Sequence, residues 1–200
     1  MAYSDFNLAQ LQSQFHLTIS QALLFKEIKA FSPPNWLPVL LDKAMPLALS
    51  SEKARSEFII APILLSLKDD HPDIGIYSGQ RLDSDISQGL LGECDFIISA
   101  SQSLALIQKP IISIVEAKKS DIESGLGQCA AQMLGAQHLN LRQQNSHDVV
   151  YGCVTTGEVW QFLKLQKQSL LIDSERYYIN ELGLILAVLQ QILAEFDRLY

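Results

Sequence analysis

The sequence has few cysteines, and they are far apart. Three occur among its 200 residues, Cys94, Cys129 and Cys153, and none belongs to a C-x-x-C pair. An odd number of widely spaced cysteines in apolar surroundings argues against a disulfide framework. We therefore expect three reduced and mostly buried thiols, as is usual in a cytoplasmic protein.

A long uninterrupted apolar run is also missing. The longest, from Leu182 to Leu193, contains Gln190 and Gln191, and it is too short to cross a bilayer. The N-terminal segment from Met1 to Asn7 has neither the basic nor the apolar region of a signal peptide. These absences predict a cytoplasmic protein that makes no use of a membrane.

Basic residues are outnumbered by acidic ones. The chain has 15 Lys and Arg against 22 Asp and Glu, which gives a net charge of −7 and a pI near 5.0. Such a balance argues against a protein that coats nucleic acid by bulk charge, because phosphate affinity comes mainly from Lys and Arg. It leaves room for a local basic groove, or for a site where a bound metal supplies positive charge.

The apolar content is that of a folded domain. Apolar residues make up 48% of the chain and charged residues 18%, and 200 residues suffice for a single domain with a substantial core. Apolar residues have helical spacing over 6–31, interrupted near 18–20, and a short helix is expected over 37–45 after the prolines at 33 and 34. We therefore predict that residues 1–50 form a helical extension packed on this domain.

A helix is predicted from the Ser50-Ser51-Glu52 cap to about Leu67, bent at Pro62. On a helical wheel Glu57 lies on the apolar face with Ala54, Ala61 and Leu64, and a carboxylate there is uncommon. Two interpretations stay open for Glu57: a functional acid, or an i,i+4 ion pair with Lys53.

The rest of the chain alternates strands and helices. Three runs, at 74–82, 92–99 and 111–119, are typical of strands joined by short links, which predicts an antiparallel meander. A capping box from Ser120 to Glu123 predicts a helix to about residue 141. We also expect a β-hairpin of 149–155 and 158–165 around Thr156-Gly157, an edge strand at 170–173 and an amphipathic helix over 180–199.

The run at 111–119 ends in charged residues. In a strand, Ile112, Ile114, Glu116 and Lys118 would share one face, and Asp95 would share a face of its own strand with Glu93 and Ile97. Two carboxylates that converge repel each other unless a cation lies between them. Mg²⁺ accepts one or two carboxylates, a backbone carbonyl and several waters, and Ala117 would supply the carbonyl.

The pattern Asp95…Glu116-x-Lys118 resembles the PD-(D/E)xK nuclease superfamily. That superfamily has an acid on the first core helix, matched by Glu57, and often a Gln on the helix after the E-x-K strand, matched by Gln128. Here Cys94 stands where the name-giving motif has Pro. The resemblance covers residues 51–166, with 167–200 as an edge strand and C-terminal helix. It implies a single α/β (mixed α+β) domain with a restriction-endonuclease-like core: helix, three-stranded antiparallel meander, helix, β-hairpin.

The resemblance also implies roles. Asp95, Glu116 and the Ala117 carbonyl would bind Mg²⁺ or Mn²⁺, and Glu57 would bind a second metal or orient a water. Lys118 would position or deprotonate the attacking water, supported by Gln128. The implied activity is Mg²⁺-dependent hydrolysis of phosphodiester bonds in nucleic acid, with DNA favoured over RNA. So acidic a chain would gain basic surface by forming a homodimer or binding another subunit.

Two alternatives accompany this interpretation. One is a nuclease-like scaffold without activity that acts as an interaction or nucleic-acid-binding module. The other is a dinucleotide site, since Gly125-x-Gly127-x-x-Ala130 has the G-x-G-x-x-A form. The fingerprint turn follows its strand directly, whereas Lys118 and Gly125 are several residues apart. Close helix packing is therefore the preferred explanation of the glycines.

Overall fold

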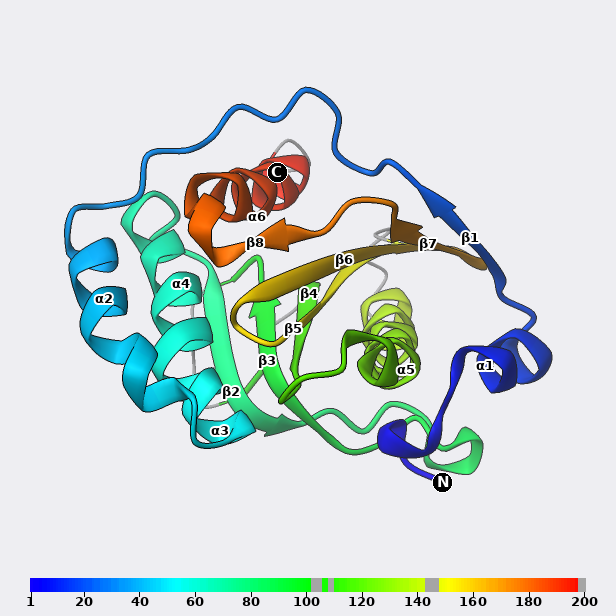
Figure 1. The fold of residues 1–200 in the computed structure, drawn as a ribbon. Coiled ribbons are helices and arrows are strands. Elements are labelled where there is room, and N and C mark those ends of the chain that lie inside the picture. Colours follow the sequence, from blue (N-terminus) through cyan, green and yellow to red (C-terminus); the bar gives the residue numbers. More distant parts are fainter. Residues whose placement is uncertain (102–105, 108–109, 143–147, 198–200) are drawn as a thin grey trace.

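The computed structural model describes residues 1–101, 106–107, 110–142 and 148–197, and its centre is one mixed sheet (Figure 1). Seven strands follow in the order β1-β7-β6-β5-β4-β3-β2, and β8 pairs with β6. Their bounds are β1 Thr18–Ala22, β2 Gly75–Arg81, β3 Glu93–Ser99, β4 Ile111–Ala117, β5 Val149–Thr155, β6 Val159–Gln166, β7 Ser169–Asp173 and β8 Tyr177–Tyr178. The predicted mixed α/β class is confirmed.

The strand pairing places β4 inside the sheet, between β3 and β5. β2, β3 and β4 form an antiparallel meander, and β5 and β6 form an antiparallel hairpin, both as predicted. β4 and β5 are parallel, so the chain has to cross from one end of the sheet to the other between them. Helix α5, Ile122–Arg142, makes that crossover.

Helices cover both faces of the sheet (Figure 1). Besides α5, they are α1 Leu8–Phe15, α2 Trp36–Ala48, α3 Glu52–Arg55, α4 Ala61–Ser66 and α6 Leu182–Asp197. Short 3-10 segments occur at Tyr3–Asp5, Leu67–Asp69, Ile86–Gln88 and Ile179–Glu181, and Ser56–Ile60 is a π-helical turn. One apolar cluster joins α2, α4 and α6 to the sheet, and a second joins α1 and α5 to the opposite face.

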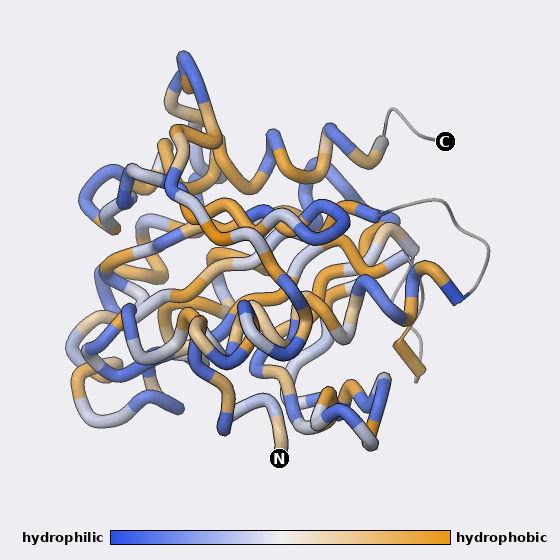
Figure 2. The backbone as a smooth tube through the Cα atoms, turned by 90° about the vertical axis from the view of Figure 1, so that its right-hand side faces the viewer, coloured by the Kyte–Doolittle hydropathy of each residue, from blue (hydrophilic) through white to orange (hydrophobic). Residues whose placement is uncertain are grey.

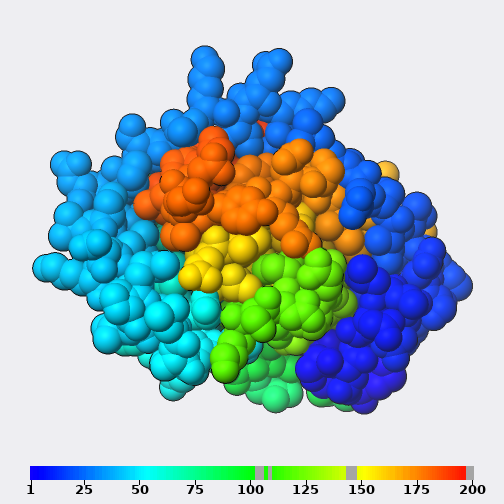
Figure 3. Space-filling model, in the orientation of Figure 1, coloured from blue at the N-terminus to red at the C-terminus, as the bar shows by residue number. Residues whose placement is uncertain are grey.

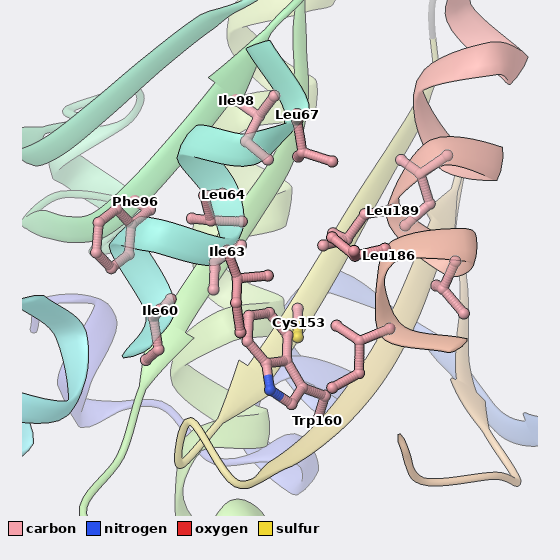
Figure 4. Close-up of a cluster of buried hydrophobic side chains, with 14 of the residues drawn as sticks. Ile60, Ile63, Leu64, Leu67, Phe96, Ile98, Cys153, Trp160, Leu186 and Leu189 are labelled. Atoms are coloured by element: carbon pink, nitrogen blue, oxygen red, sulfur yellow. The ribbon is translucent and has the colours of Figure 1, made fainter. Parts of the chain in front are cut away.

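Trp160 is at the centre of the first cluster. Its side chain is fully buried, and its Nε1 donates to Gly157 O at 3.0 Å. Figure 4 shows Trp160 and Cys153 beside Ile63 of α4, with Leu186 and Leu189 of α6 on the other side. Figure 2 shows that hydrophobic stretches run through the middle of the molecule. Cys94, Cys129 and Cys153 are buried free thiols, as predicted.

The prediction for residues 1–50 is wrong in part. Residues 18–22 form β1, which pairs in parallel with β7, and residues 23–31 form no helix. The β-branched pair Thr18-Ile19 and the pairing offered by β7 outweigh a weak helical spacing. Consequently β7 is an interior strand and β1 is the edge, contrary to the predicted edge strand at 170–173.

The start of one helix differs from prediction, and the predicted end of another is not tested. The first turn of α5 is capped from Asp121, whose Oδ1 accepts from Ser124 N at 3.4 Å, rather than from Ser120. The C-terminal helix is described to Asp197, and the predicted end at residue 199 lies outside the described residues.

Helix α6 differs from expectation in its apolar length. Among the described residues, Ile179–Phe196 is the helical segment whose length and apolar composition would allow a membrane crossing. It is longer than the apolar run from Leu182 to Leu193, which by itself is too short to cross a bilayer. In the structure its apolar side chains pack on the sheet; those buried are Ile185, Leu186, Val188, Leu189, Ile192, Leu193 and Phe196. These are the contacts of a core helix.

The helix predicted over 50–67 is interrupted by the π turn. Ser51 Oγ accepts from Ala54 N at 3.0 Å, which confirms the predicted start. The π turn at Ser56–Ile60 then shifts the side-chain directions that a regular wheel assumes. Glu57 therefore does not face the core, because its side chain is 56% exposed. The predicted apolar-face position of Glu57 is wrong.

Trp160→Ala should destabilise the fold strongly. The substitution removes a fully buried side chain and its hydrogen bond to Gly157 O, so we expect a loss of about 3–5 kcal/mol in the free energy of unfolding. Urea denaturation measures this. Trp36→Ala is the matched control, since Trp36 is 37% exposed and should cost clearly less. Equal losses for the two variants would contradict this account of the core.

Candidate metal centre

The regular pairing of β3 is interrupted at Asp95. β2 and β3 pair at Ser78↔Phe96 and again at Gln80↔Cys94, with no pairing between them at Gly79 and Asp95. Gly79 has φ +61°, a left-handed conformation that glycine adopts without steric cost. On the other side, the pairing of β3 with β4 ends at Phe96↔Val115. Asp95 thus lies where β3 has left the ladder of both neighbours.

The Asp95 side chain takes the place of the missing ladder bond. Its Oδ2 accepts from the backbone N–H of Ala117 at 2.7 Å. Strict alternation fails here, because Cys94 and Ile97 both belong to the apolar cluster on the α5 side, while Asp95 and Phe96 line a cleft. The predicted shared face of Glu93, Asp95 and Ile97 is therefore wrong for Ile97, whereas Glu93 and Asp95 both line the cleft.

A bulge in β4 changes a second predicted face. The pairs Ile98↔Ser113 and Ser99↔Ile111 leave Ile112 as an extra residue. Ile112 consequently packs in the cluster with α4 and α6, whereas Ile114 packs on the α5 side. The prediction that Ile112 shares a face with Ile114 and Glu116 is wrong for Ile112.

Glu116 is a buried carboxylate held by two donors. It is 2% exposed and is the second-last residue of β4, just before the chain crosses over into α5. Lys118 Nζ lies 2.7 Å from its Oε1, and Gln132 Nε2 donates to its Oε2 at 2.8 Å. Lys118 also donates to Gln128 Oε1 at 3.2 Å. The structure therefore brings together the predicted residues Glu116, Lys118 and Gln128.

Small residues on α5 make these contacts geometrically possible. A Cβ on Gly125 would lie 2.5 Å from Val154 Cγ1, which is too close, and 3.1 Å from Lys118 Cγ, so glycine lets α5 pack closely on β5 beside Lys118. A Cβ on Gly127 would lie 2.3 Å from Phe6 O. Both glycines are inside α5, which confirms close packing as their role and argues against a dinucleotide fingerprint.

Burial and mutual charge shift the ionisation of the site. Burial, and then the negative charge of Asp95, raise the pKa of Glu116 to about 7. Burial also raises the pKa of Asp95, although the hydrogen bond from Ala117 N opposes this. Burial lowers the pKa of Lys118, but the adjacent Glu116 outweighs burial, so the net shift is upward and Lys118 stays protonated.

A cleft of about 540 Å³ opens beside Asp95. It lies between α3 with its π turn and the strands β2 and β3; the described lining residues are Glu52, Lys53, Ser56, Glu57, Ala61, Ser78, Gly79, Glu93, Asp95 and Phe96. Glu116 and Lys118 are not among these lining residues; the Lys118 side chain is 17% exposed and that of Glu116 is 3% exposed. In the lower half of Figure 3, the cyan atoms that include α3 lie to the left of the light-green atoms at the start of α5.

Glu57 and Glu52 both line the cleft, but they have different neighbours. Glu57 is on the rim, 3.8 Å from Lys53, which is the predicted alternative of an i,i+4 pair. Glu52, in the first turn of α3, is close enough for its charge to raise the pKa values of both Asp95 and Lys118. Arg55 Nη1 donates to Thr156 O at 2.9 Å and so holds α3 against the β5–β6 turn.

Sequence reasoning missed Glu52 and Gln132 as site residues. In the sequence Glu52 is only part of the predicted helix cap, and the π turn that separates its direction from that of Glu57 leaves no clear sequence signal. Gln132 did leave a signal. It occurs four residues after Gln128 in a stripe of small residues, where a second long polar side chain is unexpected.

The donor set suits a hard divalent cation. No group of three or more His, Cys, Asp or Glu side chains within the described parts of the chain is arranged to hold a metal by itself. An ion here would depend on Asp95, Glu116, the Ala117 carbonyl and retained waters, a combination that Mg²⁺ accepts. Burial, and then repulsion from Asp95, raise the pKa of Glu116, and a bound cation would reverse the repulsion.

Comparison with protein-family models and with curated proteins found no match to this chain. The function therefore has to be inferred from the geometry of the site.

The stability of the metal-free protein should fall as pH rises from about 4.5 to about 7. Because the pKa of Glu116 is raised from 4.5 to about 7, the folded state keeps a proton that the unfolded chain releases in this window. We expect a loss of roughly 1–3 kcal/mol in the free energy of unfolding, levelling off above pH 7. Urea denaturation in EDTA across this pH range measures it.

Glu116→Gln is the control for this pH dependence. The amide does not titrate, so the variant should lose most of the fall between pH 4.5 and 7. An equal fall in the variant would show that other groups cause it.

Proposed function

We propose that this protein is a metal-dependent phosphodiesterase of the PD-(D/E)xK type that acts on nucleic acid in the cytoplasm. The observation that carries the proposal is the joined set Asp95, Glu116 and Lys118. Lys118 Nζ is 2.7 Å from Glu116 Oε1, and Asp95 accepts a hydrogen bond from the backbone N–H of Ala117, which lies between Glu116 and Lys118. The set lies beside a cleft large enough for a nucleotide.

The order of the elements supports a restriction-endonuclease-like core. A helical segment at 52–66 precedes the meander β2–β3–β4, and then come α5 and the hairpin β5–β6. Asp95 is on the second strand of the meander, Glu116 and Lys118 are at the end of the third, and Gln128 is on the following helix. This is the placement that the superfamily resemblance implies.

A bound Mg²⁺ would supply positive charge against the phosphate and lower the pKa of water. The residues of the chain would prepare the site for that chemistry. Asp95 and Glu116 would hold the cation, and Asp95 would also present its charge to the cleft. Burial of Glu116 excludes bulk water from that side.

Lys118 would act as a cation and hydrogen-bond donor rather than as a base. The Glu116 carboxylate raises its pKa, so the side chain is protonated near neutral pH. Its other contact, Gln128 Oε1 at 3.2 Å, is an acceptor and also favours the ammonium form. In this geometry Lys118 would orient the attacking water or a phosphate oxygen and offset negative charge.

The charge of the cleft indicates how substrate would bind. Among the described residues that line it, Glu52, Glu57, Glu93 and Asp95 are acidic and Lys53 is basic. A polyanion is repelled by such a wall, so we propose that its binding requires the divalent cation. DNA remains the favoured substrate over RNA, and a homodimer would add basic surface from a second copy.

A second candidate function is a non-catalytic interaction module on the same scaffold. The observation that favours it is the set of apolar side chains exposed on α2, namely Trp36, Val39, Leu40 and Leu47. Contiguous exposed apolar surface commonly marks a protein interface. Absence of Mn²⁺ binding at millimolar concentration would favour this module over the enzyme.

Asp95→Ala and Lys118→Ala should each reduce cleavage by about 100-fold or more, because each removes a charged group from the reacting centre. Plasmid, single-stranded DNA and RNA substrates with Mg²⁺ or Mn²⁺ provide the measurement. Glu57→Gln is the matched control, since its exposed side chain pairs, within the described part of the chain, with Lys53 and should change the rate by a few-fold at most. Cleavage that both alanine variants retain would contradict the proposal.

A further inference from the structure

Two glutamines on α5 contact Glu116, near the end of β4, and Lys118, just after it. Gln128 and Gln132 are one helical turn apart and therefore lie on one face of α5. Gln128 Oε1 accepts from Lys118 at 3.2 Å, whereas Gln132 Nε2 donates to Glu116 Oε2 at 2.8 Å. Each glutamine thus serves a different member of the Glu116-x-Lys118 motif.

The Gln132 amide is satisfied on one side only. Its side chain is fully buried, and Nε2 has a second acceptor in Glu93 O at 3.3 Å. Its Oε1 has no hydrogen-bond partner in the described part of the chain. A buried amide oxygen without a partner costs about 1–3 kcal/mol. A methionine would fill similar space without that cost, so the donor Nε2 is the feature that packing alone does not explain.

The Glu116 carboxylate needs a donor on each oxygen to keep one orientation. Lys118, just after the end of β4, contacts Oε1, and Gln132 of helix α5 contacts Oε2. Without Gln132, Lys118 would be the remaining donor and the carboxylate would be free to turn toward the ammonium. Groups that orient a metal ligand in this way typically change metal affinity by about 10–100-fold.

We propose that Gln132 is a positioning residue that orients Glu116 toward a divalent cation, while Gln128 positions Lys118. The inference rests on the metal site of the proposed function, but not on nuclease activity itself. It separates two neighbouring glutamines that sequence alone would treat as equivalent.

The test compares Gln132→Met with Gln128→Met. Calorimetry with Mn²⁺ alone, without nucleic acid, should show about 10–100-fold weaker binding for Gln132→Met and a change of less than about 3-fold for Gln128→Met. In cleavage assays at saturating Mn²⁺, Gln128→Met should be the more impaired of the two variants. Saturating Mn²⁺ should largely restore the rate of Gln132→Met, whereas Gln128→Met should keep a lowered kcat at every Mn²⁺ concentration.

A second variant guards against a folding defect. Gln132→Asn retains the amide but is one methylene shorter, so its nitrogen should not reach Glu116 and Mn²⁺ binding should weaken as in Gln132→Met. Thermal unfolding identifies which of the two variants is folded, and the comparison uses that variant.

The outcomes separate this inference from the proposed function. Mn²⁺ affinity that stays unchanged in a folded Gln132 variant overturns the positioning role alone. Weakened Mn²⁺ binding in a protein that cleaves no nucleic acid supports the positioning role and contradicts the nuclease. A wild-type protein that binds no Mn²⁺ overturns both.

Discussion

The burial of the Glu116 carboxylate is the constraint on which the site depends. An ionised carboxylate at 2% exposure is costly unless donors surround it. Lys118 and Gln132 supply them, and Gly125 lets α5 lie close to β5 and to the Lys118 side chain. The small-residue helix, the parallel crossover and the buried charge are therefore parts of one arrangement.

Backbone irregularities gather around the same cleft. Gly79 has a positive φ opposite Asp95, and the π turn at Ser56–Ile60 turns Glu57 to the rim. Such features cost stability in a sheet or helix and are common near functional sites. At Gly79 the pairing of β2 with β3 is interrupted, and the Asp95 side chain opposite it contacts Ala117 N and lines the cleft.

The sequence predicts the features of this structure that depend on residues close together in the chain, and it misses those that depend on distant contacts. The meander, the crossover helix and the hairpin depend on periodicity and turn residues, and all were predicted. β1 was missed because its pairing with β7 is a contact between distant parts of the chain. The shared face of Glu116 and Lys118 follows from strand alternation, and the contact of Lys118 with Gln128 is one that the superfamily resemblance implies. The faces of Ile112, Ile97 and Glu57 do not follow from regular periodicity, because a bulge, a pairing gap and a π turn change them without a clear sequence signal.

The most direct test of the metal site is a crystal of the protein soaked in Mn²⁺, with anomalous scattering measured at the Mn edge. The account predicts a peak between the carboxylates of Asp95 and Glu116, adjacent to the Ala117 carbonyl. It also predicts that Gln132 Nε2 keeps its contact with Glu116. An anomalous map without a peak there at millimolar Mn²⁺, with Lys118 alone neutralising Glu116, would contradict the account.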